Sequence, residues 1–126
     1  MANKLLVKKL DKVFSLYIRK RDSTDDEWFE CCSCRKIKPY EQMDAGHWAG
    51  RRHMATRWNE NNVHGQCRHC NRFCEGNPAG YALFMARVYG LDHMEYLESL
   101  SRTTVKFTDE DLKSKIEFYK SLLTNT

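Results

Sequence analysis

The sequence predicts a small α+β protein in which two strands and a helix form a zinc-bound ββα unit with further helices around it. Three observations lead to this prediction. Two Cys-x-x-Cys pairs, Cys31/Cys34 and Cys67/Cys70, enclose short strand patterns. Amphipathic helical patterns precede the first pair and follow the second. The length of 126 residues is that of one domain.

Residues 1–22 are predicted to contain a basic amphipathic helix over residues 4–21. Its apolar side chains recur at helical spacing: Leu6, Leu10, Val13, Phe14, Tyr17 and Ile18. We expect the apolar stripe either to pack in the protein core or to form a surface for a partner helix. Lysine and arginine fill most other positions, so the polar face could lie along phosphates or face water. The acidic and hydroxyl-rich run over 22–26 predicts a linker.

Residues 28–90 are predicted to form the core. Its elements in order are a short strand, an extended segment, a loop, a second strand and a helix: residues 28–31, 40–48, 50–61, 62–66 and 68–75. A Cys pair stands at each end of this unit. Because so small a unit buries little apolar area, a bound metal would supply part of its folding free energy.

A helix over 78–89 has clear signals at both ends. Asn77 can cap its start with Pro78 at the first helical position, and Gly90 can end it. We expect this helix to bury one stripe: Tyr81, Phe84, Met85 and Val88.

Residues 91–126 are predicted as a helical extension. Residues 92–100 form one helix, and Thr108 followed by Asp111 has the form of a capping box that begins another. The last helix runs to about residue 123, and we expect it to bury Leu112, Ile116, Tyr119 and Leu123.

The charge distribution indicates the class of partner. The formal net charge is +4, and basic residues exceed acidic ones by six in residues 1–21 and by five in residues 35–72. A polyanion such as DNA is the expected partner, and two solvated basic faces are the alternative. No apolar run approaches the ~18 residues of a membrane span. The start lacks the apolar region of a signal peptide, so we expect no membrane and a cytoplasmic address.

The four cysteines of the two pairs suit a closed tetrahedral site for structural zinc. A reducing compartment disfavours disulfides, which also favours metal. Two cysteines are left over. Cys32 and Cys74 are each more typical of a small buried residue than of a ligand, although Cys74 follows the second pair by one helical turn and could replace one of its members.

The residue order resembles the HNH (ββα-metal) nuclease superfamily. A histidine closes a strand, an asparagine stands five residues before the second Cys pair, and a metal-binding residue follows that pair. The segments Asp44–Trp48 and Asn62–Asn71, with the helix to Gly90, are similar to the NinG/Rap recombination-endonuclease family of lambdoid phages, in which asparagine replaces the last histidine. The resemblance covers about residues 28–90, and the chain is shorter than typical family members.

The resemblance implies an HNH-like nuclease core and a role for each matching residue. His47 would be the general base, and Asn62 would hold the loop between the strands. Asn71, with Asp44, would bind a catalytic Mg²⁺ or Mn²⁺. The implied activity is a metal-dependent DNA endonuclease that cuts Holliday junctions or D-loops to 5′-phosphate ends, in the host cytoplasm. Two cuts in one junction suggest a homodimer.

The sequence departs from the superfamily directly before His47. Many members carry a metal-binding acid there, whereas this chain has Gly46. Asp44 is the nearest acid and reaches the metal if the strand bends at Gly46. Alternatively, His47 is itself a metal ligand, and His53 or His64 is the base.

Arginines surround the proposed site in sequence. Because arginine pairs bidentately with phosphate, they predict a clamp on the DNA backbone: Arg51, Arg52, Arg57, Arg68 and Arg72. Trp48 and Trp58 could stack on an unpaired base or cover the core. No element is evidently dedicated to base readout, which favours structure-selective cleavage. The rival functions are a non-catalytic zinc-binding DNA module, a nicking, restriction or packaging nuclease, and a protein–protein adaptor.

Overall fold

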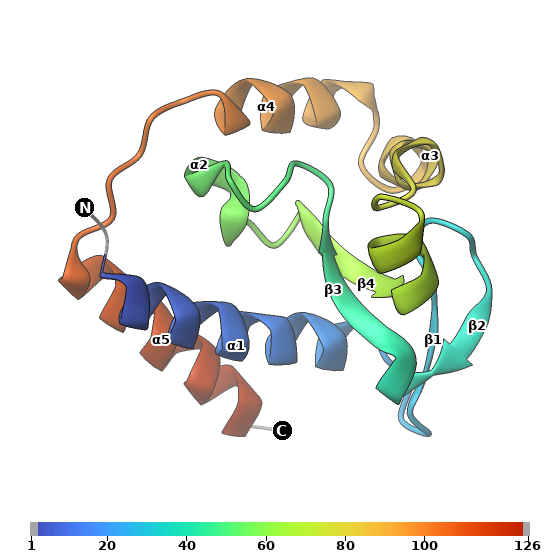
Figure 1. The fold of residues 1–126 in the computed structure, drawn as a ribbon, viewed down its shortest axis with the longest axis horizontal. Coiled ribbons are helices and arrows are strands. Elements are labelled where there is room, and N and C mark those ends of the chain that lie inside the picture. Colours follow the sequence, from blue (N-terminus) through green and yellow to red (C-terminus); the bar gives the residue numbers. More distant parts are fainter. Residues whose placement is uncertain (1–2, 125–126) are drawn as a thin grey trace.

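The computed structural model describes residues 3–124 (Figure 1). Residues 1–2 and 125–126, the outer ends of the two predicted terminal segments, lie outside the described residues. The helices are α1 (Lys4–Arg21), α2 (Met54–Arg57), α3 (Pro78–Val88), α4 (Leu91–Ser101) and α5 (Asp109–Thr124). The strands are β1 (Trp28–Glu30), β2 (Ile37–Pro39), β3 (Met43–His47) and β4 (Val63–Cys67). The α+β class is confirmed.

Two antiparallel strand pairs frame the cysteines. β1 pairs with β2 around the first Cys pair, and β3 pairs with β4 so that Gly46 lies opposite His64 and His47 opposite Val63. A π-helical turn, η2 (His69–Phe73), follows β4 directly. Strand, strand and helix therefore follow one another in the predicted order, with α2 inside the connection between β3 and β4.

The structure differs from the prediction at two places in this region. Residues 40–42 form a short 3₁₀ turn, η1 (Tyr40–Gln42), and are not extended, and β2 has no counterpart in the prediction. A three-residue strand in which no side chain is buried carries no alternation to detect. The predicted loop over 50–61 contains α2, because Thr56 is fully buried and Met54 packs against the main core.

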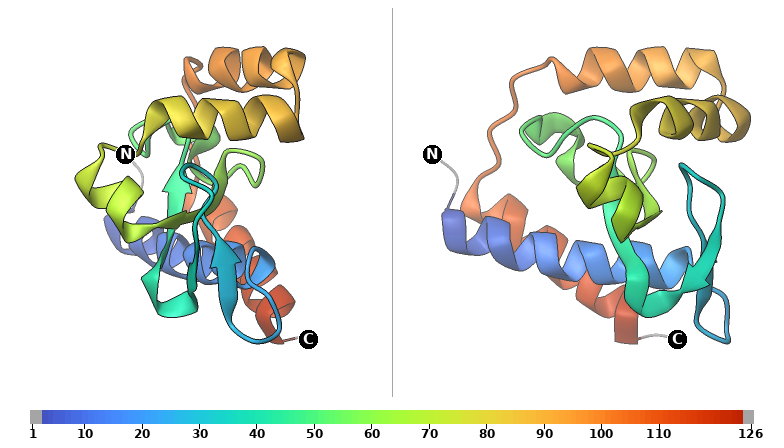
Figure 2. Two further views of the ribbon diagram at one scale, coloured as in Figure 1. Left: turned by 90° about the vertical axis from the view of Figure 1, so that its right-hand side faces the viewer. Right: turned by 45° about the vertical axis from the view of Figure 1, so that its right-hand side comes forward.

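The first and last helices pack against each other beneath the β3–β4 pair, while α3 and α4 lie on its other side (Figures 1 and 2). The main core joins Leu10 and Phe14 of α1 to Leu112 and Tyr119 of α5 and to Val63 of β4. One core thus draws on all three predicted segments, and each such fully buried side chain contributes about 1.5–3 kcal/mol. The apolar stripe of α1 therefore packs in the core of this chain, the first of its two predicted roles.

The helix ends predicted from the sequence are confirmed. Asn77 accepts a hydrogen bond from the Gly80 N–H at the start of α3, and Gly90 follows its end with φ +85°. Thr108 and Asp111 exchange the two hydrogen bonds of a capping box, at 2.9 and 3.0 Å. These caps depend on neighbours in sequence, which is why pattern alone finds them.

The predicted buried stripe of α3 is wrong at its last position. Tyr81 and Met85 are buried with Leu97 of α4, but Val88 is 55% exposed. Val88 is the last residue of the helix, and its side chain faces solvent. In α5 the predicted stripe is buried at three of its four positions, and the fourth, near the helix end, is partly exposed.

Candidate functional site

The thiols of the two Cys pairs converge. The sulfur atoms of Cys31, Cys34, Cys67 and Cys70 all lie within 4.8 Å of one another. Backbone N–H groups of Cys67 and Cys34 donate to the Cys31 sulfur at 3.3 and 3.5 Å, and the Cys70 N–H donates to the Cys67 sulfur at 3.5 Å. Four sulfur ligands in a largely buried cluster could hold a zinc ion.

The protonation of this cluster favours a divalent cation. The hydrogen bond from Cys32, followed by backbone N–H groups, lowers the pKa of Cys31 to about 3. Burial raises the pKa of Cys67 and raises that of Cys70 to about 12, and the charge on Cys31 adds to both shifts. Only a cation can compensate four thiolates at this distance, so the donor set fits zinc.

Neither spare cysteine belongs to the cluster. Cys32 is buried against Tyr81, Met85 and Leu97, as expected of a small apolar side chain. Cys74 is exposed. The expectation of a buried side chain is therefore wrong for Cys74, because the π-helical turn ends at Phe73 and leaves the next residue facing solvent.

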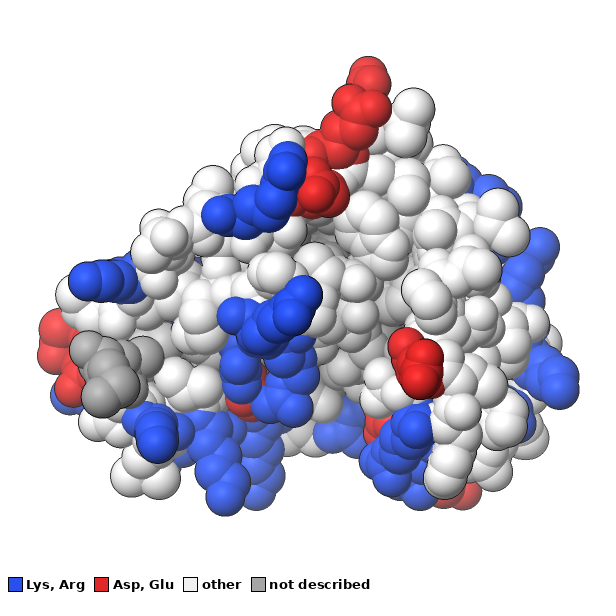
Figure 3. Space-filling view, turned by 45° about the horizontal axis from the view of Figure 1, so that its top comes forward, with Lys and Arg blue, Asp and Glu red and all other residues white. Residues whose placement is uncertain are grey.

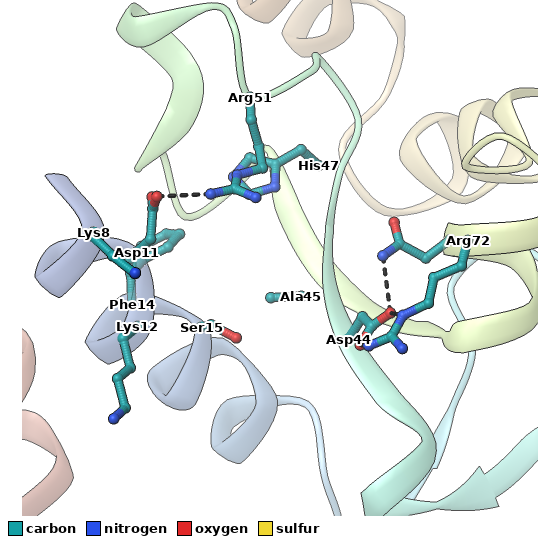
Figure 4. A pocket seen from close by; sticks show the side chains of 11 residues that line it. Lys8, Asp11, Lys12, Phe14, Ser15, Asp44, Ala45, His47, Arg51 and Arg72 are labelled. Atoms are coloured by element: carbon teal, nitrogen blue, oxygen red, sulfur yellow. Dashed lines mark hydrogen bonds and ion pairs between the residues drawn. The ribbon is translucent and has the colours of Figure 1, made fainter. Parts of the chain in front are cut away.

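A cleft of about 420 Å³ lies between α1 and the β3–η2 segment (Figure 4). It brings together five of the residues predicted from the sequence: Asp44, His47, Arg51, Asn71 and Arg72. The opposite wall comes from α1: Lys8, Asp11, Lys12, Phe14 and Ser15. The cleft therefore joins residues far apart in the sequence, including a helix that the motif does not contain.

His47 lies in this cleft in its neutral form. Its Nε2 is 2.9 Å from the backbone carbonyl oxygen of Arg57. Since a carbonyl only accepts, Nε2 carries the proton and Nδ1 has the free lone pair. Burial, and then the charge of Arg51, lower the pKa of His47 to about 4. A neutral imidazole with a free nitrogen can accept a proton at pH 7.

Asp44 and Asn71 are neighbours across β3 and η2. The Asn71 side-chain amide donates to Asp44 Oδ2 at 3.0 Å, and Arg72 donates to both Asp44 oxygens at 2.9 Å. The carboxylate and the amide oxygen are the ligand types that hard divalent cations prefer. Among the described residues, however, only the four cysteines form a group of three or more His, Cys, Asp or Glu side chains close enough to hold a metal.

The structure explains why no acid precedes His47. A Cβ atom placed on Gly46 would lie 2.0 Å from the Gln66 side-chain oxygen. Gln66 is fully buried and donates to Ser33 Oγ and the Gly76 carbonyl, at 2.8 and 2.7 Å, so it cannot easily move away. Position 46 thus has no room for any side chain, and Asp44 is the acid that β3 offers to this cleft.

Asn62 connects the strands to the loop between them. It is fully buried, accepts from the Ala49 N–H at 2.8 Å and donates to the carbonyls of Ala49 and Thr56 at 3.0 and 3.1 Å. These bonds hold the loop that carries the Arg57 carbonyl. Asn62 therefore acts on His47 through the backbone and does not reach the cleft itself.

Comparison with known proteins places the chain in a family. The model of the family described as "Bacteriophage Lambda NinG protein" matches residues 2–126. The chain belongs to the NinG family. It is similar to Protein ninG of Escherichia phage lambda, with 29% identity over 118 residues, and to Protein ninG of Salmonella phage P22, with 28% identity over 118 residues.

Both alignments cover 92% of this chain and 55% of the relative. The chain spans about half the length of the curated relatives it matches. No solved structure matches it. Among its described helices, none combines the length and apolar character needed to cross a membrane.

The other histidines proposed as the base lie elsewhere in this NinG-family chain. His64 is buried between the hydroxyl groups of Tyr81 and Tyr89, at 3.0 and 2.7 Å, and burial lowers its pKa to about 4. His53 precedes α2 and accepts a hydrogen bond from Arg52 Nε at 3.2 Å. Of the five histidines, His47 alone lines the cleft.

The predicted arginine clamp is dispersed. Arg51 and Arg72 line the cleft and are more than half exposed, whereas Arg52 and Arg68 are exposed outside it. Arg57 differs most from the prediction, because its side chain is only 16% exposed and its guanidinium is bound by the carboxylate of Asp11 in α1. Its positive charge is therefore compensated within the protein, by Asp11.

The two tryptophans cover apolar clusters of the NinG-family fold. Trp58 is buried in the main core, and Trp48 packs against the cluster around Tyr81. Trp58 has little surface on which a base could stack, since the residue is only 6% exposed.

Asp11 is one of the α1 residues lining the cleft that sequence reasoning did not assign to the site. It accepts hydrogen bonds from the guanidinium of Arg57, from Trp58 Nε1 at 3.0 Å and from Arg51 Nη2 at 2.8 Å. It therefore ties α1 to the loop whose backbone orients His47. The available signal was that Asp11 is the single acid among the seven basic residues of segment 1–21.

Proposed function

We propose that this chain is a divalent-metal-dependent DNA endonuclease that cuts branched recombination intermediates, such as Holliday junctions and D-loops, to 5′-phosphate ends. The observation that carries the proposal is the cleft in which neutral His47, with Nδ1 free, shares a wall with Asp44 and Asn71. The resemblance to the HNH superfamily and the basic charge of the region support the same reading.

Phosphodiester hydrolysis needs an activated water and neutralisation of charge at phosphorus. His47 Nδ1 takes the proton of the attacking water, and the Arg57 carbonyl holds the ring in the required tautomer. Asp44 and Asn71 would hold Mg²⁺ or Mn²⁺, which when bound supplies charge neutralisation at the phosphate and the leaving 3′ oxygen. Arg51 and Arg72 face the same cleft and can pair with phosphate oxygens.

The proposed preference for branched DNA rests on the kind of contact that the cleft can make with its substrate. Phosphate contacts position a substrate without reading its bases, and no described element is dedicated to base edges. A four-way junction presents two strands for cutting, so a homodimer with two clefts fits this substrate. As a phage protein the chain would act in the host cytoplasm.

The test is cleavage of an end-labelled four-way junction, a D-loop and a matched linear duplex by zinc-loaded protein with Mg²⁺, Mn²⁺ or EDTA. His53→Ala is the matched control for His47→Ala, since His53 lies outside the cleft. We expect divalent-dependent cutting of the branched DNA by wild type and His53→Ala. His47→Ala should be slower by about 10²–10⁴-fold. Equal rates for the two variants would contradict the assignment of His47.

A second candidate is a zinc-binding DNA module without catalysis. The bidentate contact of Arg72 with Asp44 favours it, because that contact uses both oxygens that a catalytic cation would need. It predicts junction binding that His47→Ala leaves unchanged and no cutting by folded, zinc-loaded wild type. Cutting of linear duplex as fast as junction would favour a nicking, restriction or packaging role.

A further inference from the structure

Lysines of α1 form the wall of the cleft that faces His47. Lys8 and Lys12 are exposed, stand one helical turn apart and line the cleft with Ser15 (Figure 4). Within residues 3–124, neither lysine forms an ion pair. Arg51 and Arg72, in contrast, are paired with carboxylates.

The charge of the cleft is therefore set by α1. Four basic side chains and two carboxylates line it, which gives a net charge of +2 with His47 neutral. Both carboxylates already contact arginines, so the uncompensated charge is that of Lys8 and Lys12. Basic side chains gather at the middle and lower edge of one face in Figure 3. An anion entering the cleft would meet this charge opposite His47.

The α1 wall is held at a fixed position relative to His47. Asp11, on the same face of α1, binds the side chains of Arg57, Trp58 and Arg51. The neighbouring Phe14 is buried and packs edge-on against Tyr119, with ring centroids 4.9 Å apart. Because both the polar and the apolar face of α1 are anchored, the backbone from which its lysines extend is held in place opposite His47, so binding need not first order the helix.

We propose that α1 is the second wall of the substrate groove, where Lys8 and Lys12 bind the phosphate backbone of the DNA strand and hold it against His47 and Asp44. The inference rests on the proposed function and adds a residue set that the nuclease motif does not contain. Residues four apart on a helix are about 6 Å apart along its axis. Phosphates of one strand follow every ~3.4 Å of duplex. The two lysines can therefore contact phosphates that are close neighbours.

The matched control lies on the same helix. Lys9 is also an exposed lysine but does not line the cleft. We would measure binding of a fluorescent four-way junction in EDTA at about 50–200 mM salt for wild type, Lys8→Gln, Lys12→Gln and Lys9→Gln. All variants change the charge equally, so only position distinguishes them. Zinc content and circular dichroism would check that each variant is folded.

We expect Lys8→Gln and Lys12→Gln each to weaken the salt dependence, so that the slope of log K against log salt becomes less negative by about one. In the double variant it should become less negative by about two. Lys9→Gln should keep the wild-type slope and affinity. If the cleft variants bind as Lys9→Gln does while wild type binds and cuts the junction, the groove assignment is wrong and the nuclease proposal stands. If wild type binds no junction at all, both are wrong.

Discussion

Replacing Asp11 with alanine should destabilise the protein far more than its position in a basic surface helix suggests. The carboxylate accepts two hydrogen bonds from Arg57 and one each from Trp58 and Arg51. Burial raises the pKa of Asp11, but the hydrogen bonds and charges of Arg57 and Arg51 outweigh burial and lower it overall. The carboxylate is therefore held in its charged form by these arginines.

The magnitude follows from what the substitution leaves behind. Asp11→Ala strands the largely buried Arg57 guanidinium, and breaking a buried ion pair costs about 3–5 kcal/mol. The Trp58 N–H, also buried, loses its acceptor at a further cost of about 1–3 kcal/mol. Because Asp11 itself is 20% exposed and the two costs overlap, we expect a loss of about 3 kcal/mol.

Urea unfolding of the zinc-loaded protein, followed by tryptophan fluorescence, measures this loss. Arg51→Ala is the control, since it removes one contact of Asp11 at a side chain that is 59% exposed. Such an exposed pair contributes about 0–1 kcal/mol. The reasoning would be refuted if Asp11→Ala and Arg51→Ala lowered the free energy of unfolding equally.

Three further predictions test the metal cluster, the strand and a buried histidine. Cys34→Ala should abolish zinc binding and unfold the core, whereas Cys74→Ser should retain one zinc per chain by atomic absorption. Gly46→Ala should cost about 1–3 kcal/mol in urea unfolding, because its Cβ would strike the buried glutamine opposite. Gly50→Ala, with open space around it, should cost little. Burial lowers the pKa of His64 from 6.5 to about 4, so below pH 6.5 the unfolded state binds a proton that the folded state does not. Stability should therefore fall by about 2 kcal/mol between pH 7 and pH 5 through this group. His64→Asn should show a correspondingly smaller fall, and an identical pH dependence would contradict the assignment.

Local features of this protein were predictable from its sequence. The cysteine pairs, the Asn77 cap and the Thr108 capping box each involve residues within four positions of one another. The four long helices, α1, α3, α4 and α5, follow from apolar spacing, and their positions agree with the structure to within a few residues, whereas the short helix α2 was predicted as loop. The convergence of the two Cys pairs was also predictable, because metal-ligand spacing is a chemical pattern that does not depend on the rest of the fold.

Which of the histidines lines the cleft was decided by tertiary structure. His47 and His64 lie on adjacent strands, and alternation along a strand does not say which face meets a cleft and which meets two tyrosines. The absence of an acid at position 46 likewise follows from the close approach of Gln66, a contact across the strand pair.

The assembly of the cleft also depended on contacts between distant segments. Asp11 contacts Arg57 across 46 positions of the chain, and that contact converts an expected phosphate ligand into an internal ion pair. The sequence by itself determined the four-cysteine cluster, the boundaries of the four long helices and the strand that carries His47, because these depend on neighbouring residues. Only the tertiary structure decided that α1 faces His47 across the cleft, because the packing of α1 against α5 and the central strands sets that position.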